Sequence, residues 1–115
     1  MTLKDKKVLV AGAGKSGIGS ANLLIRSGAS VSLYDGNEHL KAQDVYDKLE
    51  EKKQIRLILG ELGPGEEEEF DLLVLSPGIS VNAPVSRQFM DSGRPVWSEI
   101  ELAFQVSRGQ IAAIT

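Results

Sequence analysis

The chain lacks the residue patterns on which several large classes of protein depend. It contains no cysteine, which excludes disulfide frameworks, thiolate metal sites and thiol redox chemistry. Aromatic residues make up only 5% of its 115 residues and no basic stripe interleaves with them, so we expect no nucleic-acid partner. No apolar run is long enough for a signal peptide or a membrane span. We therefore expect no membrane partner and a cytoplasmic location.

Residues that carry catalysis are also scarce. The single histidine, His39, falls in a charged segment and is expected at the surface. No set of serine, histidine and aspartate, no pair of carboxylates and no metal-ligand cluster stands out. A net charge of −3 and a hydrophobic content of 42% are typical of one soluble globular domain. The sequence predicts a binding module without catalytic residues or a metal site of its own.

Short apolar runs alternate with longer segments of helical spacing, a pattern typical of an α/β fold with a parallel sheet. Strands are expected at 8–11, 31–34, 55–59, 72–75, 95–97 and 111–115, and helices at 16–27, 38–53, 83–92 and 99–107. We expect Asn82 and Ser98 to cap the last two helices, and the run Glu66 to Glu69 to form a solvated face. The predicted fold is a Rossmann-like open parallel sheet of about five strands, in the order 3-2-1-4-5, with helices on both faces.

Three glycines, Gly12, Gly14 and Gly17, stand in a G-x-G-x-x-G spacing between the first expected strand and the first expected helix. At such a turn, backbone N–H groups and the helix dipole meet an anion. The first glycine allows the tight turn, the second lets a phosphate approach the backbone, and the third lets the helix pack closely. A triphosphate loop also ends in Gly-Lys-Ser, but it requires glycine where this chain has Leu9, inside the strand.

The second expected strand ends in an acidic residue. Asp35 lies 18 positions beyond Gly17, close to the roughly 20 typical of an acid that meets a nucleotide's sugar. This spacing and the glycine turn together favour a nucleotide that contains a diphosphate. Two other interpretations stay open: the glycines only permit helix packing, and Asp35 only caps the next helix. An autonomous NAD-binding or nucleotide-sensing domain would carry the same turn, although no residues for hydride transfer are found.

Four stretches, in order along nearly the whole chain, carry a resemblance to a known family: "VLVAGAGKSGIGSANLLIRSGASVSLYD", "LLVLSPGIS", "WSEIELAF" and "IAAIT". They resemble the N-terminal domain of the Mur ligase family, and in particular of the member that adds D-glutamate to UDP-N-acetylmuramoyl-L-alanine. The resemblance implies a cytoplasmic step of peptidoglycan precursor synthesis that uses ATP and magnesium and proceeds through an acyl phosphate. It further implies that the ATP, magnesium and D-glutamate sites lie in other domains, so that this fragment holds no cofactor and is not catalytic.

The resemblance also implies a division of the chain and a set of contacts. Residues 1–109 would form the domain that binds the UDP substrate, and residues 110–115 the first strand of a truncated ATP-binding central domain. The partner would be UDP-N-acetylmuramoyl-L-alanine. The full-length enzyme is expected to be a monomer, and the C-terminal strand of the fragment either to fray or to pair with another sheet edge, such as that of a second chain.

The implied substrate contacts lie in three turns. At the diphosphate would lie Gly14, Lys15, Ser16 and Gly17, with the backbone N–H groups of Lys15 and Ser16 as donors. Asp35 and Gly36 would face the uracil. The uridine and sugar would lie beside Ser76, Pro77 and Gly78. Family relatives often carry a hydroxyl residue and then a basic residue after the acid. This chain departs from that pattern with Gly36 and Asn37.

Overall fold

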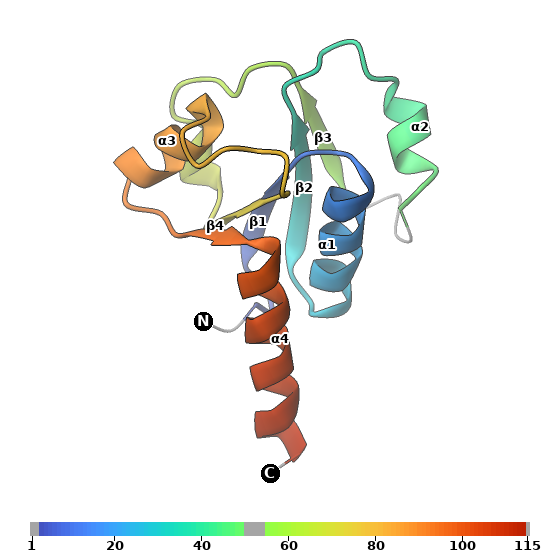
Figure 1. The fold of residues 1–115 in the computed structure, drawn as a ribbon, viewed down its shortest axis with the longest axis vertical. Helices are drawn as coiled ribbons and strands as arrows, with labels where there is room; N and C mark the ends of the chain where they lie inside the picture. Colours follow the sequence, from blue (N-terminus) through green and yellow to red (C-terminus); the bar gives the residue numbers. More distant parts are fainter. Residues whose placement is uncertain (1–2, 50–54, 115) are drawn as a thin grey trace.

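The computed structural model describes residues 3–49 and 55–114, and for residues 109–114 it describes the backbone alone. The chain forms alternating strands and helices around one sheet (Figure 1). In chain order the elements are β1 Lys7–Ala11, α1 Lys15–Arg26, β2 Ser30–Asp35, α2 Ala42–Tyr46, β3 Arg56–Leu59, the 3₁₀-helix η2 Glu66–Glu69, β4 Leu72–Leu75, α3 Pro84–Asp91, β5 Val96–Ser98 and α4 Glu99–Ile114.

The sheet has five strands, all parallel, in the order β3-β2-β1-β4-β5. β1 lies at the centre, where Val10 pairs with Leu33 of β2 on one side and with Val74 of β4 on the other. The apolar runs of β1 and β4 suit this position, because a central parallel strand is covered on both faces. The predicted fold class and strand order are confirmed.

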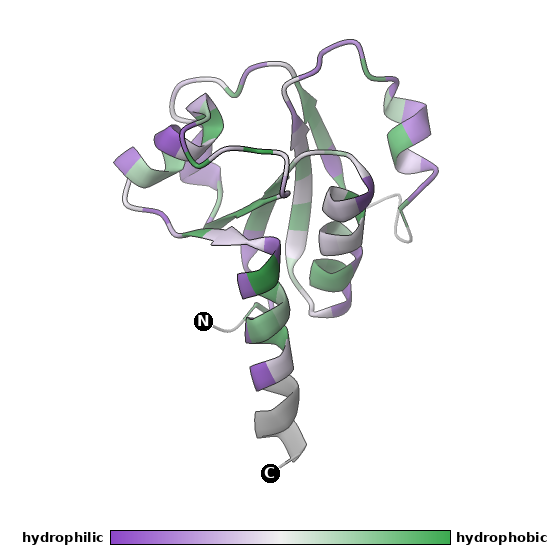
Figure 2. Ribbon diagram, in the orientation of Figure 1, coloured by the Kyte–Doolittle hydropathy of each residue, from purple (hydrophilic) through white to green (hydrophobic). Residues whose placement is uncertain are grey.

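Each face of the sheet packs against its own layer of helices. Ile18 and Leu24 of α1 and Leu102 of α4 share one apolar cluster with the sheet. Phe89 of α3 and Phe70 belong to the cluster on the opposite face. In Figure 2 hydrophobic colour lies along β1, β3 and β4 and on parts of α1 and α4, and hydrophilic colour lies in the loops and on the outer parts of the helices. Apolar burial on both faces thus holds the strand ends, and the loops that leave them, in fixed positions.

The helix starts agree with the sequence in part. The hydroxyl of Ser98 accepts a hydrogen bond from the Glu101 N–H at 3.1 Å, which confirms the predicted cap of α4. The predicted cap at Asn82 is wrong. Ala83 occupies the capping position of α3 without a side-chain bond, and the backbone N–H of Asn82 donates to the hydroxyl of Ser80 at 3.0 Å.

The helix expected at 38–53 is much shorter. Only Ala42–Tyr46 is helical before residue 49, and residues 50–53 lie outside the described part of the chain. A turn takes the place of the first predicted helical residues, because the Asn37 side chain accepts a bond from the His39 N–H at 3.0 Å. The His39 side chain is 88% exposed, as predicted.

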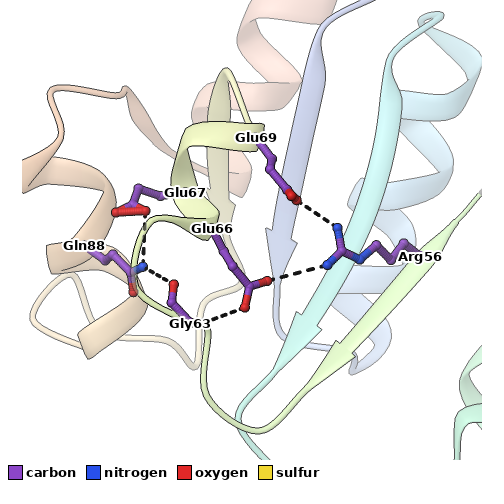
Figure 3. A network of polar contacts seen from close by, with 6 residues as sticks. All are labelled: Arg56, Gly63, Glu66, Glu67, Glu69 and Gln88. Atoms are coloured by element: carbon purple, nitrogen blue, oxygen red, sulfur yellow. Dashed lines mark hydrogen bonds and ion pairs between the residues drawn. The ribbon is translucent and has the colours of Figure 1, made fainter.

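The four successive glutamates form η2 and do more than face solvent. Arg56 Nη1 contacts Glu69 Oε2 at 2.8 Å, and Arg56 Nη2 lies 3.5 Å from Glu66 Oε2 (Figure 3). On the other side, Gln88 Nε2 donates to Glu67 Oε2 at 3.3 Å. The predicted solvated face is confirmed for Glu68 and Glu69, which are exposed, whereas Glu66 and Glu67 are half-buried. The run joins β3 to α3 across the loop.

The strand expected at 111–115 is also wrong where the structure describes it. Helix α4 continues to Ile114. A short apolar run cannot by itself distinguish a strand from a helix, and extending an existing helix gains one backbone hydrogen bond per residue without a new nucleus. Ala112 and Ala113 also have the highest helix propensity. The predicted association of two fragments required a strand that this fold replaces by helix, and the domain boundary at 109/110 stays a prediction.

Candidate functional site

Three loops that the sequence singled out meet at one edge of the sheet. They follow the carboxyl ends of β1, β2 and β4 (Figure 1). The chain leaves β1 toward α1 on one face, and it leaves β4 toward α3 on the other. The two neighbouring strands therefore form a switch point, where open α/β sheets bind their ligands.

Two of the three turn glycines are required by packing. Gly12 has φ +101°, and a Cβ there would stand 2.8 Å from the Ser76 hydroxyl. A Cβ on Gly17 would overlap the carbonyl oxygen of Gly12. Gly14 differs, because its φ of −78° suits any residue and a Cβ there would meet no atom within 4 Å. Packing thus explains the first and third glycines, but it leaves the second unexplained.

The amides of the turn fall into two groups. The N–H of Gly12 donates to the Tyr34 carbonyl at 2.7 Å, and that of Ala13 to Asp35 Oδ2 at 2.9 Å. By contrast, the N–H groups of Lys15 and Ser16 have no acceptor within residues 3–49 and 55–114. They open the 12-residue helix α1, whose dipole places positive potential at this end.

Asp35 holds the turn in place. Its Oδ2 accepts from Ala13 and its Oδ1 accepts from the Asn37 N–H, both at 2.9 Å. The sequence predicted Asp35 as a ligand contact, but gave no sign that its carboxylate binds the turn's own backbone. A carboxylate has about four lone-pair sites, so these two bonds leave room for a ligand donor. The neighbouring Gly36 is exposed.

The third loop is tied to the same turn. The Ser76 hydroxyl lies 3.4 Å from the Gly12 carbonyl oxygen, and the Ser76 N–H donates to Ala11 at 3.1 Å. Pro77 and Gly78 are exposed in the tight turn that follows. The structure therefore brings together all three predicted segments. It assigns the Ser76 hydroxyl and the Asp35 carboxylate a bracing role that the sequence did not show.

Two cavities flank the start of α4. The first, which we call the α1–α4 cleft, has about 360 Å³ and is lined by residues that include Lys15, Ser16, Leu23, Glu99 and Leu102. The second, the β4–β5 groove, has about 410 Å³ and is lined by residues that include Ser76, Pro77, Val81, Trp97, Glu99 and Ile100. Glu99 lines both. Sequence reasoning missed it, because a glutamate in a first helical turn is commonplace.

The chemistry available at this edge is that of binding. Within the described ranges no three His, Cys, Asp or Glu side chains gather as metal ligands. The residues do not fit a triphosphate loop, because Leu9, where the loop needs glycine, is fully buried in β1. No helix in the part of the chain that the structure describes is both long and apolar enough to cross a membrane. The arrangement suits an anionic group held by backbone donors.

The sheet, the glycine turn and the acid after β2 define the class of doubly wound nucleotide-binding domains. Residues 6–98 match the family described as "Mur ligase MurD-like, N-terminal domain". Over all 115 residues the chain is 46% identical to the UDP-N-acetylmuramoylalanine–D-glutamate ligase of Lachnospira eligens and 41% identical to that of Lachnoclostridium phytofermentans. The chain belongs to the MurD-like N-terminal domain family of the Mur ligases. It spans about 25% of the length of these relatives.

Solved structures agree on the fold. A pseudomurein peptide ligase type C from Methanothermus fervidus superimposes with a TM-score of 0.69, at 21% identity, over 88% of this chain and 20% of that one. A shikimate dehydrogenase from Aquifex aeolicus superimposes with a TM-score of 0.59, at 15% identity, over 88% of this chain and 45% of that one. At these identities the likeness extends to the fold alone, which ligases and dehydrogenases share.

Proposed function

We propose that this chain binds the UDP end of UDP-N-acetylmuramoyl-L-alanine, as the N-terminal domain of a ligase that adds D-glutamate to that substrate. The proposal extends to this chain the activity for which its relatives are named. The reaction would be a cytoplasmic step of peptidoglycan synthesis. One observation carries the assignment: the amides of Lys15 and Ser16 at the start of α1 have no acceptor among the described residues.

The diphosphate would lie against these two amides. Hydrogen bonds from backbone donors to a charged group contribute roughly 1.5–3 kcal/mol each, and a helix dipole adds about 0.3–1 kcal/mol. Gly14 leaves the approach to the backbone open, since a Cβ there meets nothing within 4 Å. The exposed Lys15 side chain adds positive charge near the same point.

The uridine would extend from this site toward β2 and β4. Asp35 and Gly36 would meet the uracil, while Ser76, Pro77 and Gly78 would line the other side of the uridine and sugar. The braces from Asp35 to Ala13 and from Ser76 to Gly12 support this part of the proposal, because they fix the three loops before any ligand arrives. Such preorganisation lowers the entropic cost of binding.

Amide-bond formation would belong to the rest of the ligase. The chain covers a quarter of its relatives' length, and its residues do not form the ATP loop. We therefore assign ATP and magnesium to the other domains of a monomeric enzyme, and we expect the fragment alone to be inactive. Its contribution would be to bind and orient the substrate.

Calorimetric titration of the chain with UDP-N-acetylmuramoyl-L-alanine and with NAD tests the proposal. We expect weak but measurable binding of the UDP compound and poorer binding of NAD, because nothing at this edge is arranged for nicotinamide. Tighter binding of NAD would favour the alternative of an autonomous NAD-binding domain and overturn the ligase assignment.

Gly14→Val provides a test within the site itself. The backbone at this position suits any residue and the space around it is open, so the variant is expected to fold. The branched side chain would hold the diphosphate away from the Lys15 and Ser16 amides and lower UDP affinity by about tenfold or more, which is the loss of one charge-assisted bond. Gly14→Ala, with a single methyl group, should show a smaller loss. Full UDP binding by a folded Gly14→Val would make the turn purely structural.

A further inference from the structure

Glu99 is the one described residue with a buried side-chain oxygen, Oε2, that has no hydrogen-bond partner. Leaving a buried polar atom unpaired costs free energy, so such an atom calls for an explanation. The dipole of α4 favours an acid in its first turn, but the dipole does not supply a donor. The Glu99 side chain lines both the α1–α4 cleft and the β4–β5 groove. The residue that carries this unpaired oxygen therefore stands between two cavities at the edge of the sheet where the three loops meet, which we call the ligand edge.

The negative charge of Glu99 is unfavourable beside the proposed diphosphate site. The α1–α4 cleft also contains Lys15 and Ser16, whose amides we assign to a diphosphate. A carboxylate beside that site repels a phosphate. No ion pair between Lys15 and Glu99 is found in the ranges that the structure describes, so the lysine does not neutralise the acid. A carboxylate that neither supports the fold by a hydrogen bond nor favours the diphosphate suggests a role toward another part of the ligand.

The order of the strands indicates which part of the ligand would lie near Glu99. Along the ligand edge, the loop with Asp35 follows β2, the glycine turn follows β1, and then come β4 and β5 with the start of α4. A nucleotide that places its uracil at Asp35 and its diphosphate at Lys15 would continue toward β4 and β5. The group next in line in a UDP-sugar is the sugar. Its hydroxyl and amide N–H groups are donors, and a carboxylate accepts hydrogen bonds only.

We propose that Glu99 accepts a hydrogen bond from the sugar of the bound UDP-sugar and thereby selects sugar nucleotides over UDP itself. This inference rests on the proposed function. Of the two adjoining cavities, the β4–β5 groove offers Trp97 and Val81 as an apolar wall on the side of the sugar, a common lining for a small-molecule site that a few polar groups orient. Glu99 is thus a specificity-determining residue, and no bond is made or broken there.

The experiment compares UDP with UDP-N-acetylmuramoyl-L-alanine on the wild-type chain and on Glu99→Gln. The variant should lower affinity for the sugar nucleotide by about tenfold, the lower end for a bond to a charged group. It should leave affinity for UDP unchanged or raise it, because it removes a negative charge near the diphosphate. Glu99→Asp, which keeps the charge but withdraws the oxygen, should also lose sugar affinity. Thermal unfolding of both variants checks that they fold.

Glu101→Gln is the matched control. It removes the same charge from the same first turn of α4, but Glu101 lines neither cavity and its Oε1 accepts from Gln105 at 2.9 Å. We expect both affinities to stay within about twofold of wild type, because this carboxylate lines neither cavity. Equal losses for UDP and the sugar nucleotide in Glu99→Gln, or no loss for either, would overturn the inference while leaving the proposed function intact. Failure of the wild-type chain to bind both compounds would instead overturn the proposed function, and the inference with it.

Discussion

Single residues at the ligand edge combine structural and binding roles. Asp35 uses both carboxylate oxygens to hold Ala13 and Asn37, and Ser76 braces Gly12. A substitution at either position would therefore disturb the turn as well as any ligand contact, and a loss of binding could not be assigned to one cause. Gly14 and Glu99 are better probes, because a Cβ on Gly14 would meet no atom within 4 Å and Glu99 Oε2 has no hydrogen-bond partner within the described residues.

Tyr34 provides a test of burial at the residue scale. Its side chain is only 9% exposed. Burial, followed by the charges of Asp35 and Glu61, raises the pKa of Tyr34 above its ordinary value of 10.0. The folded state therefore favours the protonated hydroxyl, and this contribution to stability is fully present below pH 10.0. It is lost as the pH rises through the higher pKa of the folded state.

We expect the free energy of unfolding to fall more steeply above pH 10.0 in the wild-type chain than in Tyr34→Phe. At pH 8 the two should differ by no more than about 0.5 kcal/mol, because the hydroxyl has no protein partner in the described residues and such substitutions are usually mild. Urea unfolding at pH 8 and pH 11 measures the difference. Identical slopes in the two proteins would show that burial does not disfavour the tyrosinate.

At the scale of elements, helix α1 contains two glycines in contrasting positions. Gly17 packs against the Gly12 carbonyl, whereas Gly19 has no atom within 4 Å of its absent Cβ. Gly17→Ala should destabilise the fold by about 1–3 kcal/mol, the usual cost of overpacking. Gly19→Ala should stabilise it by about 0.5–1 kcal/mol, because alanine loses less backbone entropy in a helix. Chemical denaturation of both variants measures the two changes in the free energy of unfolding. Equal effects would mean that α1 does not approach the turn as closely as the structure shows.

The elements also show what a sequence can and cannot predict. β1 and β4 were predicted nearly to the residue, because continuous apolar runs bounded by turn residues have few other solutions in a parallel sheet. The shortening of α2 and the extension of α4 were not predicted. At the start of α2, a turn made by Asn37 competes with the helix. At the end of α4, a short apolar run can form either a strand or a helix.

The candidate site also has a part that the sequence predicts and a part that it does not. Two of its loops could be predicted because the glycine spacing and the acid after β2 are local signals with a known geometry. The third, Ser76 to Gly78, followed only from the resemblance to a known family. The braces made by Asp35 and Ser76, and the position of Glu99 between two cavities, could not be predicted. They join residues far apart in sequence, such as Gly12 and Ser76, and a single sequence contains no signal for the pairing.

At the scale of the whole molecule, the ligand edge is built by the fold as a unit. The three loops leave β1, β2 and β4, which are buried between two apolar clusters. The site therefore exists only when the sheet is assembled. A ligand that needs all three loops binds the folded chain and not the unfolded one, so it must stabilise the whole domain by mass action.

This coupling gives a prediction that needs no assay of activity. UDP-N-acetylmuramoyl-L-alanine at about 100 times its Kd should stabilise the chain by about 2.7 kcal/mol and raise the Tm by on the order of 10 °C for a domain of this size. NAD at the same concentration should raise the Tm less, and Gly14→Val should lose most of the shift caused by the UDP compound. Differential scanning fluorimetry of the two proteins with each compound measures the four shifts. A full shift in a folded Gly14→Val would mean that the ligand stabilises the chain from some other surface, because the diphosphate could no longer reach the amides of Lys15 and Ser16.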